Sequence, residues 1–261
     1  MTMDKQLKEH MLKLVQSGKR GDGRGLTEYR TPITVIPGIS QTAEGSAQVQ
    51  IGDTVVMAGV KLSIERPYPD TPEQGSITVN VELYPLSNPD YEPGPPGIYA
   101  VELARVVDRG IREAKAIDLK KLCIEKGEKA WTVNIDIVTI NDAGNLFDAC
   151  ALAAIAALRD AVFPAYEDGK LDYAVKTKKK LPLTKEPVSV TVSKLGSALL
   201  VDPDCDEEKV CDARLTVAST PEGMLSALQK GGDAPLTLAD IERMTGLALE
   251  KTAFLRGKLE G

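Results

Sequence analysis

Three arginines could bind the backbone of a single-stranded nucleic acid. Arg105, Arg109 and Arg112 are spaced i, i+4 and i+7, so on a helix they fall on one side and form a cationic ridge of about 10 Å. A guanidinium group binds phosphate with two parallel hydrogen bonds, and successive phosphates of one strand are spaced on a scale that such a ridge can follow. The pattern therefore indicates a candidate phosphate-binding surface.

A solvated helix face is the alternative explanation for these arginines. Asp108 precedes Arg112 by four residues, and Glu102 precedes Arg105 by three. Both spacings allow intrahelical ion pairs, which are common on protein surfaces and contribute little to stability. The spacing alone does not decide between the two explanations.

Six carboxylates in the C-terminal part of the chain could bind a divalent cation. They follow a predicted strand and comprise Asp202, Asp204, Asp206, Glu207, Glu208 and Asp212. Magnesium and manganese prefer such hard oxygen ligands, although a solvated acidic turn explains the same composition. A second candidate is the turn at 142–145, because N–H groups at the start of the following helix could receive a phosphate. Asp142 and Asp148 would repel that anion, and no lysine or arginine adjoins the turn.

The rest of the composition excludes several classes of protein. The chain has 261 residues, a net charge of −6 and a single histidine, His10, which removes Ser–His–Asp, Cys–His and His-ligated metal chemistry. The four cysteines lack CxxC spacing, so neither a zinc site nor a disulfide framework is expected. An acidic chain with few aromatic residues is not a basic nucleic-acid coat, so any RNA contact must be a local patch or be shared with a partner. No apolar run is long enough to span a membrane and the N-terminus lacks the features of a signal peptide, so a cytoplasmic protein without a membrane partner is expected.

The elements that must position these residues form two similar blocks. Apolar alternation predicts strands in the first block at 31–36, 46–51, 55–64, 76–83 and 129–140. The first four of these strands are expected to form an antiparallel meander. Helical periodicity predicts helices at 4–17 and 102–121, and the segment 146–162 is apolar nearly all round, as a helix buried between layers requires.

The second block repeats this plan in a shorter form. Strands are predicted at 188–193, 198–202, 214–218 and 224–229, and a final helix at 238–258. Strands followed by a helix, twice over, indicate a duplicated α+β architecture. The expected units are an N-terminal helix and glycine-rich loop at 1–27, a first half at 28–163, a linker at 164–187 and a second half at 188–261. The linker is polar and basic, and its lysines are expected to be solvated: Lys176, Lys178, Lys179 and Lys180.

Several motifs in the chain resemble the RNase PH family. They are Arg20-Gly-Asp-Gly-Arg24, Ala43-Glu-Gly-Ser-Ala47, Ile51-Gly-Asp-Thr-Val55 and, after Asp202, Asp212-Ala-Arg-Leu-Thr-Val217. The similarity runs from about residue 19 to the C-terminus. Within the family, Glu92-Pro-Gly-Pro-Pro96 followed by Glu102-Leu-Ala-Arg-Val-Val-Asp-Arg109 is similar to the non-catalytic RNase PH-like subunit of the archaeal exosome.

The resemblance implies a fold, an assembly and a role. The fold is two RNase PH-type halves, each a β-sheet with helices, packed together. The assembly is a hexameric ring in which this type of subunit alternates with a catalytic RNase PH-like subunit, and RNA-binding cap subunits lie on one face. The ring degrades single-stranded RNA from the 3′ end with inorganic phosphate. The RNA-backbone arginines of the family fall at Arg105 and Arg109, and Arg112 is added because it lies on the same ridge.

Two departures from the catalytic members of the family indicate a subunit without catalytic residues. Those members carry Gly-Thr/Ser-Arg before the central helix to hold the attacking phosphate, whereas residues 144–146 are Gly-Asn-Leu here. Loss of a charge-assisted phosphate contact removes about 1.5–3 kcal/mol of binding. Those members also place two aspartates six residues apart; here Asp212 matches the second, and either Asp206 or Glu208 takes the first position. The acids alone therefore do not exclude a metal site, and the missing phosphate-binding motif is the main evidence against catalysis.

The sequence therefore predicts a non-catalytic subunit that has no metal site and no cofactor. It would structure the active site of its catalytic neighbour and bind the RNA backbone. Two alternatives stay open. One is a self-sufficient phosphorolytic exoribonuclease that uses Asp206 and Asp212, and the other is a purely structural ring spacer whose arginines only make ion pairs.

Overall fold

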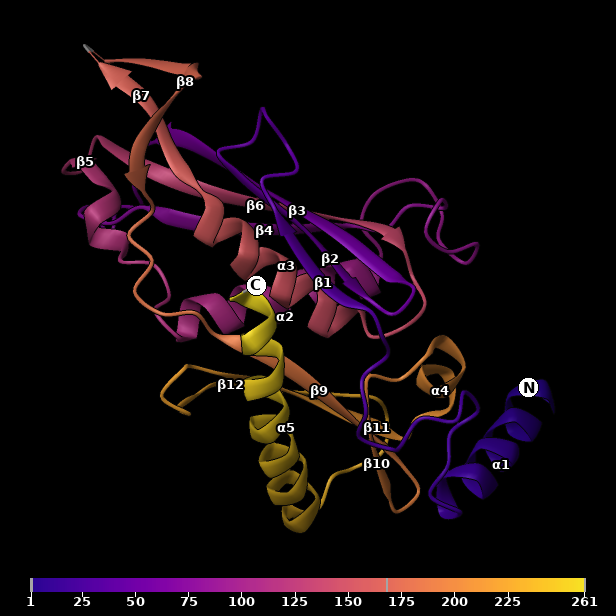
Figure 1. Cartoon of the computed structure of the whole chain (residues 1–261). Coiled ribbons are helices and arrows are strands. Elements are labelled where there is room, and N and C mark those ends of the chain that lie inside the picture. The colour runs from indigo at the N-terminus through magenta and orange to yellow at the C-terminus, as the bar shows by residue number, and fades with distance from the viewer. Residues whose placement is uncertain (1, 168, 261) are drawn as a thin grey trace.

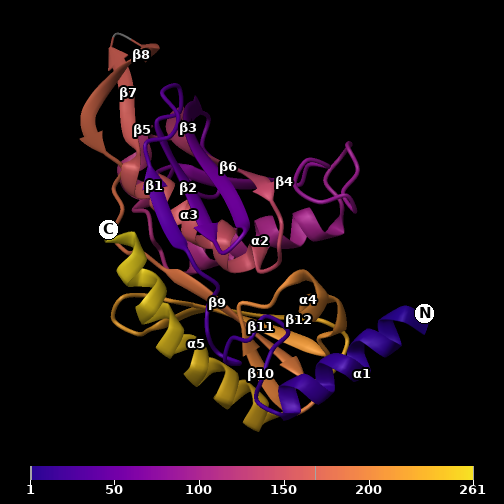
Figure 2. The ribbon, with the colours of Figure 1, turned by 45° about the vertical axis from the view of Figure 1, so that its right-hand side comes forward.

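Two β-sheets lie on either side of the buried helix α3 (Leu146–Asp160), as Figures 1 and 2 show. The computed structural model describes residues 2–167 and 169–260. The first sheet has six strands in the order β1-β2-β3-β6-β4, with β5 beside β6. Their bounds are Ile33–Pro37 (β1), Gly45–Ile51 (β2), Thr54–Glu65 (β3), Ser76–Glu82 (β4), Cys123–Glu125 (β5) and Lys129–Asn141 (β6).

The second sheet has four antiparallel strands in the order β10-β9-β11-β12. Their bounds are Val188–Leu195 (β9), Ala198–Val201 (β10), Ala213–Ser219 (β11) and Leu225–Gly231 (β12). Helix α5 (Leu238–Leu259) packs on β9 and β11, and it begins at Thr237, which forms a capping box with Asp240. Helix α1 (Thr2–Gln16) packs against the short helix α4 (Cys205–Val210) at the edge of this half.

Helix α3 is the centre of the core. Every residue from Leu146 to Leu158 is buried, because the helix packs on β2 and β3 with one side and on β9 with the other. Its alanines allow this close approach, and a Cβ at Gly45 on β2 would lie only 2.4 Å from the carbonyl oxygen of Ala157. The prediction of an apolar helix between two layers is confirmed, and so is the α+β architecture.

The strand order differs from the predicted meander. Strands β1, β2 and β3 do pair antiparallel in sequence order, but β6 lies between β3 and β4, and β4 runs parallel to β6. Parallel neighbours need a crossover connection rather than a tight turn. Helix α2 (Ile98–Glu113) supplies that crossover, and it packs against β4 and α3.

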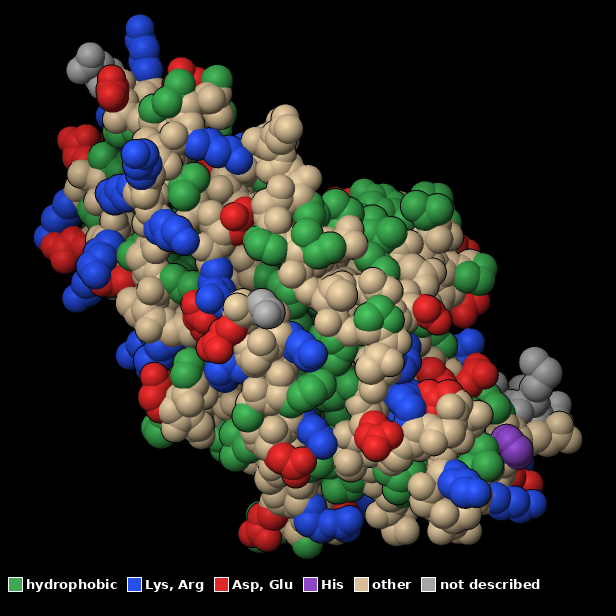
Figure 3. Space-filling model, viewed as in Figure 1, with side chains coloured by type: hydrophobic (Ala, Val, Ile, Leu, Met, Phe, Trp, Pro, Cys, Tyr) green, Lys and Arg blue, Asp and Glu red, His purple; other side chains and the backbone are tan. Residues whose placement is uncertain are grey.

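Two further segments differ from the sequence expectation. The helix predicted to reach residue 121 ends at Glu113, because Lys115 has a φ of 51° and Ile117 forms a β-bridge with Leu183. The expected linker folds as a hairpin of β7 (Val162–Glu167) and β8 (Lys170–Lys180) that projects from the first half. Its lysines are exposed, as predicted, and basic side chains gather over this hairpin and the neighbouring β5 in Figure 3. Across both described ranges, each helix is too short or too polar to cross a bilayer.

Candidate functional site

Helix α2 carries the candidate arginines on its solvent side. Its other side is buried through Leu103, Val107 and Gly110, which face the core and the second sheet. The apolar period therefore fixes the rotation of the helix, and that rotation leaves Arg105 and Arg109 exposed. Both side chains are available to a ligand from outside.

Only one of the three arginines forms an intrahelical ion pair. Arg112 lies 2.7 Å from the carboxylate of Asp108, and it also donates to the carbonyl oxygen of Ile77 at 3.1 Å. Glu102 pairs with Arg214 on β11 at 2.6 Å and not with Arg105, so the second intrahelical pair suggested by the spacing is wrong. Counting partners from residues 2–167 and 169–260, Arg105 and Arg109 make no ion pair and no side-chain hydrogen bond.

The acidic residues after β10 do not form a solvated turn. Asp204 caps helix α4 and forms a capping box with Glu207. Asp202 is 0% exposed and Glu207 is 1% exposed, although both carry a carboxylate. Glu207 is held by the buried guanidinium of Arg20, whose Nε donates to it at 2.8 Å. The burial of these acids is thus balanced by a basic partner from the distant N-terminal loop.

Asp202 is the most heavily engaged of these acids. Its carboxylate accepts hydrogen bonds from Arg24 at 3.1 Å, from the Arg30 guanidinium at 2.8 Å and from the Asn145 side chain at 2.8 Å. Three strong donors leave it little capacity for a cation. Within the described ranges, no three His, Cys, Asp or Glu side chains are arranged to hold a metal ion.

Glu208 of α4 lies against the start of α3. Asn145 precedes that helix in the left-handed conformation, with a φ of 60°, and its backbone N–H donates to Glu208 Oε1 at 2.8 Å. Its side chain also donates to Asp148 at 3.1 Å, and Arg30 donates to the carbonyl oxygen of Gly144 at 2.9 Å. An acidic group is favoured here by the partial positive charge of the helix N-terminus. The N–H of Asn145 at this helix start is therefore already bonded to a carboxyl group of the chain itself.

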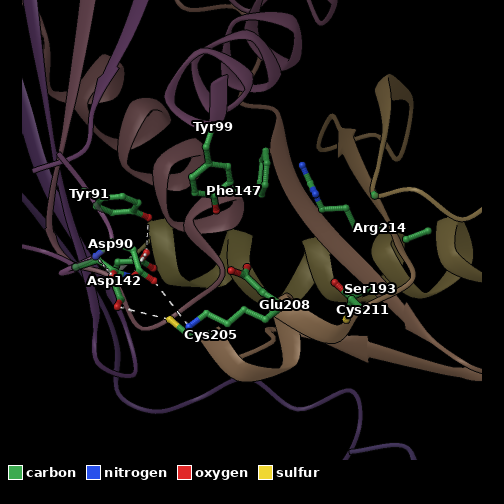
Figure 4. A pocket seen from close by; sticks show the side chains of 14 residues that line it. Asp90, Tyr91, Tyr99, Asp142, Phe147, Ser193, Cys205, Glu208, Cys211 and Arg214 are labelled. Atoms are coloured by element: carbon green, nitrogen blue, oxygen red, sulfur yellow. Dashed lines mark hydrogen bonds and ion pairs between the residues drawn. The ribbon is translucent and has the colours of Figure 1, made fainter. Parts of the chain in front are cut away.

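A cleft of about 340 Å³ lies between the two halves beside this helix start (Figure 4). Its walls include Tyr99 and Phe147, and the guanidinium of Arg214 lies 4.5 Å from the centre of the Phe147 ring. Glu208 and Asp142 point into the same space, and Asp142 accepts a hydrogen bond of 2.5 Å from the hydroxyl of Tyr91. The two cations that line the cleft both have carboxylate partners: Arg214 pairs with Glu102 at 2.6 Å, and the exposed Lys209 lies 3.8 Å from Asp90.

The two aspartates with catalytic spacing do not meet in this cleft. In the described part of the chain, neither Asp206 nor Asp212 is among the residues that line it. Asp212 accepts from Lys8 Nζ at 2.6 Å and from the backbone N–H of Gly196 at 2.7 Å. Burial opposes its ionisation, but these two donors outweigh that effect and lower the pKa of Asp212. Asp212 is thus a structural carboxylate that connects α1 to the second sheet.

Burial raises the pKa values of two acids near the start of α3. It raises the pKa of Glu208 to about 7, and repulsion from Asp142 acts in the same direction. It also raises the pKa of Asp148 to about 7, although hydrogen bonds from Tyr29, Asn145 and Thr191 oppose the shift. Both carboxyls therefore titrate near neutral pH, where a phosphate-binding site would need positive charge.

Comparison with known proteins identifies the fold and the family. Sequence models of the 3′ exoribonuclease family match two parts of the chain: domain 1 matches residues 28–164, and domain 2 matches residues 185–251. The chain belongs to this family. The RNase PH assignment made from the motifs is therefore confirmed, and the two sheets with their helices are two RNase PH domains.

Relatives within the family are similar over nearly their whole length. The chain is 46% identical to the exosome complex component Rrp42 of Methanosarcina acetivorans over 255 residues, which cover 97% of this chain and 94% of the relative. It is 45% identical to the Rrp42 component of Thermoplasma acidophilum over 251 residues, with coverage of 96% and 94%. A chain of the Archaeoglobus fulgidus exosome with RNA bound to the active site is 44% identical, with a TM-score of 0.90 over 99% of both chains. A chain of an archaeal exosome core has a TM-score of 0.87 at 40% identity and full coverage.

The sequence analysis named some of the residues described above and missed others. The arginines of α2 and the turn before α3 were recognised from their spacing and their position before a helix. It did not predict that Arg20, Arg24 and Arg30 pair with the acidic segment. The glycine-rich Arg20–Arg24 motif was a signal for the family, but nothing local to it shows that its arginines are directed inward to carboxylates more than 170 residues away.

Proposed function

We propose that this chain is a non-catalytic ring subunit of an exosome-type 3′-to-5′ phosphorolytic exoribonuclease, and that it binds the RNA backbone. The observation that carries the proposal is the hydrogen bond of 2.8 Å between Glu208 and the N–H of Asn145. In catalytic members, as the motif comparison implies, the corresponding helix start holds the attacking phosphate. Here the chain's own carboxyl group takes that place, and Gly-Asn-Leu supplies neither a hydroxyl nor a cation.

The arginines of α2 are proposed to hold the phosphates of single-stranded RNA. Arg105 and Arg109 are exposed and, among the residues described, uncommitted, so they can bind phosphate without breaking an existing ion pair. Arg112 is proposed as a weaker contact, because its guanidinium already donates to Asp108 and Ile77. Contacts of this kind position an RNA strand without reading its sequence.

The proposed assembly is a heterohexamer in which this subunit alternates with a catalytic RNase PH-like subunit and structures its active site. RNA-binding cap subunits would complete the complex, and the proposed location is the cytoplasm. The names of the Rrp42 relatives and the two exosome structures support an exosome subunit. The positions of Asp206 and Asp212 outside the cleft argue against a self-sufficient exoribonuclease.

Phosphate-dependent shortening of a labelled oligo(A) tests the proposal. The chain alone is expected to give no shortening, whereas a mixture with the catalytic family subunit of the same organism is expected to degrade the substrate. Asp212→Ala in this chain serves as the control for a hidden active site. Activity of the isolated chain that Asp212→Ala abolishes would contradict the proposal and support the self-sufficient enzyme.

A further inference from the structure

A cavity of about 490 Å³ lies at the C-terminal end of α2, where the chain continues into the short 3₁₀ helix η1 (Leu119–Leu122). Three cations line it, Arg112, Lys115 and Lys120, and they face a single carboxylate, Asp118. The chain as a whole has a net charge of −6, so this excess of positive charge around the cavity is local. A cavity of this kind is suited to an anion.

The ammonium groups of Lys115 and Lys120 are available to a ligand. Both residues are exposed, and among residues 2–167 and 169–260 neither ammonium group makes an ion pair or a hydrogen bond. Asp118 is engaged elsewhere, because it accepts from the backbone N–H of Lys120 at 3.2 Å and lies 3.4 Å from the ammonium group of Lys121. The two lysines can therefore bind an anion without losing an internal partner.

Lys115 has a backbone conformation that usually selects glycine. Its φ is 51°; its N–H donates to the carbonyl of Arg112 and the next N–H donates to the carbonyl of Ile111, both at 3.0 Å. This is the Schellman motif that ends many helices, and glycine is the common residue at the left-handed position. Lysine is strained there, and its exposed side chain gains no burial in return. Strained residues of this kind are concentrated at functional sites.

Hydrogen bonds from distant segments fix the walls of the cavity. The N–H of Asp118 donates to the carbonyl of Pro182 at 3.0 Å, and the hydroxyl of Thr184 donates to the carbonyl of Lys115 at 2.8 Å. Four aliphatic side chains complete the lining: Ile77, Ile111, Ile117 and Leu119. They offer an apolar surface to a ribose or a base, while the lysines are available to a phosphate. A preformed site of this kind loses little conformational entropy when it binds a ligand.

Arg112 connects this cavity to the ridge of arginines on α2. It lines the cavity, and it also lines the groove beside β4 that contains Arg105. Cations therefore recur along α2 and continue past its end. Proteins that bind single-stranded nucleic acids without sequence preference use a positively charged groove that follows the backbone. The repeated cations match the repeated phosphates of a strand, and this continuity with the ridge favours RNA over an acidic peptide.

We propose that this cavity binds a further nucleotide of the RNA strand, beyond those held by Arg105 and Arg109, and that Lys115 and Lys120 bind its phosphate. The inference rests on the proposed RNA-binding function and extends the RNA site of this chain past the end of α2. A lysine binds phosphate as a point charge, so no base preference is expected at this position.

A length series of fluorescent oligo(A), from about 4 to 12 nucleotides, tests the inference in the assembled ring and in phosphate-free buffer. The double variant Lys115→Gly plus Lys120→Gln is expected to bind the longest RNA at least about tenfold more weakly than wild type. The shortest RNA should bind as in wild type, because it occupies only the ridge arginines. Lys170→Gln plus Lys178→Gln is the matched control, since it removes two exposed lysines of β8 that do not line the cavity.

Lys115→Gly alone separates binding from folding. Glycine adopts the left-handed conformation without strain, so the midpoint of urea unfolding should rise while the affinity for long RNA falls. A variant that is more stable and yet binds RNA less tightly cannot owe its weaker binding to misfolding. A lower midpoint would assign a structural role to the Lys115 side chain and contradict the inference.

The other outcomes distinguish this inference from the proposed function. Unchanged affinity of the double variant at every length would overturn the inference, and so would an equal loss in the control. Binding of a poly-glutamate peptide that the double variant abolishes, with RNA affinity unchanged, would assign the cavity to an acidic protein. Failure of the wild-type ring to bind RNA of any length would refute the proposed function itself.

Discussion

The sharpest prediction concerns the two exposed arginines of α2. Replacing both in Arg105→Gln plus Arg109→Gln removes their charges without adding repulsion, and neither side chain has an internal ion pair that the change would break in the described structure. If each contributes about 1–1.5 kcal/mol through a phosphate contact, the affinity of the assembled ring for oligo(A) falls by roughly 30- to 150-fold. The fold and the ring should be unaffected, because both side chains are exposed.

The salt dependence of RNA binding is a second quantity that the double variant should change. Each phosphate contact on a single strand contributes about 0.7 to the slope of log affinity against log salt concentration, so losing two makes the slope shallower by about 1.4. Between 50 and 200 mM salt this change corresponds to roughly a sevenfold difference, and the variant is most impaired at low salt. Binding of a fluorescent oligo(A) in phosphate-free buffer measures both quantities without degrading the RNA.

Two single variants serve as controls for this measurement. Arg243→Gln changes an exposed arginine on α5 and should leave the affinity unchanged. Arg112→Gln should reduce the affinity less than replacement of Arg105 or Arg109, because the Arg112 guanidinium already has protein acceptors. Unchanged affinity and slope in the double variant would refute an RNA contact and identify the ridge as a solvated helix face. Loss of the ring instead would support the structural spacer.

Two further predictions concern stability. Because the pKa of Glu208 is raised from 4.5 to about 7, the wild-type protein pays for its ionisation in the folded state, and this group lowers stability as the pH rises through that interval. Glu208→Gln keeps the oxygen that accepts from Asn145 but cannot ionise. Between pH 4.5 and 7, urea unfolding should therefore show the unfolding free energy of the variant falling by about 1–3 kcal/mol less than that of the wild type. Identical pH profiles of the two proteins would contradict this prediction. Arg20→Ala leaves Glu207 buried without its partner and should cost about 3–5 kcal/mol of unfolding free energy. Arg66→Ala, which breaks an exposed pair, should cost less than about 1 kcal/mol, and equal losses in the two variants would refute the argument.

Local periodicity predicted most of the elements but not how they pair. Alternation located the strands of both sheets apart from the short β5, because side chains on a strand must point to opposite faces. It did not place β6 between β3 and β4, since an alternating strand is equally consistent with an antiparallel neighbour and with a parallel one. The choice depends on the α2 crossover, which is a property of the whole first half.

The partners and the burial of charged residues were even harder to predict from the sequence than the strand order. The composition of the acidic segment allowed either a divalent-cation site or a solvated turn, yet Asp202 and Glu207 are buried because arginines from the N-terminal loop reach them. The pairing of Glu102 was also decided at long range, because Arg214 on β11 lies closer to it than any arginine of its own helix.

The sequence by itself determined the family, the buried central helix and the spacing of the arginines on α2, because these depend on motifs and on the fixed geometry of one helix or strand. Only the tertiary structure decided that Arg105 and Arg109 make no ion pair with any residue it describes, and that Glu208 of α4 accepts a hydrogen bond from the N–H of Asn145 at the start of α3. The physical reason is the same in each case. Whether a charge or a backbone group is free depends on which distant groups the fold brings within hydrogen-bonding distance, and no local pattern records that.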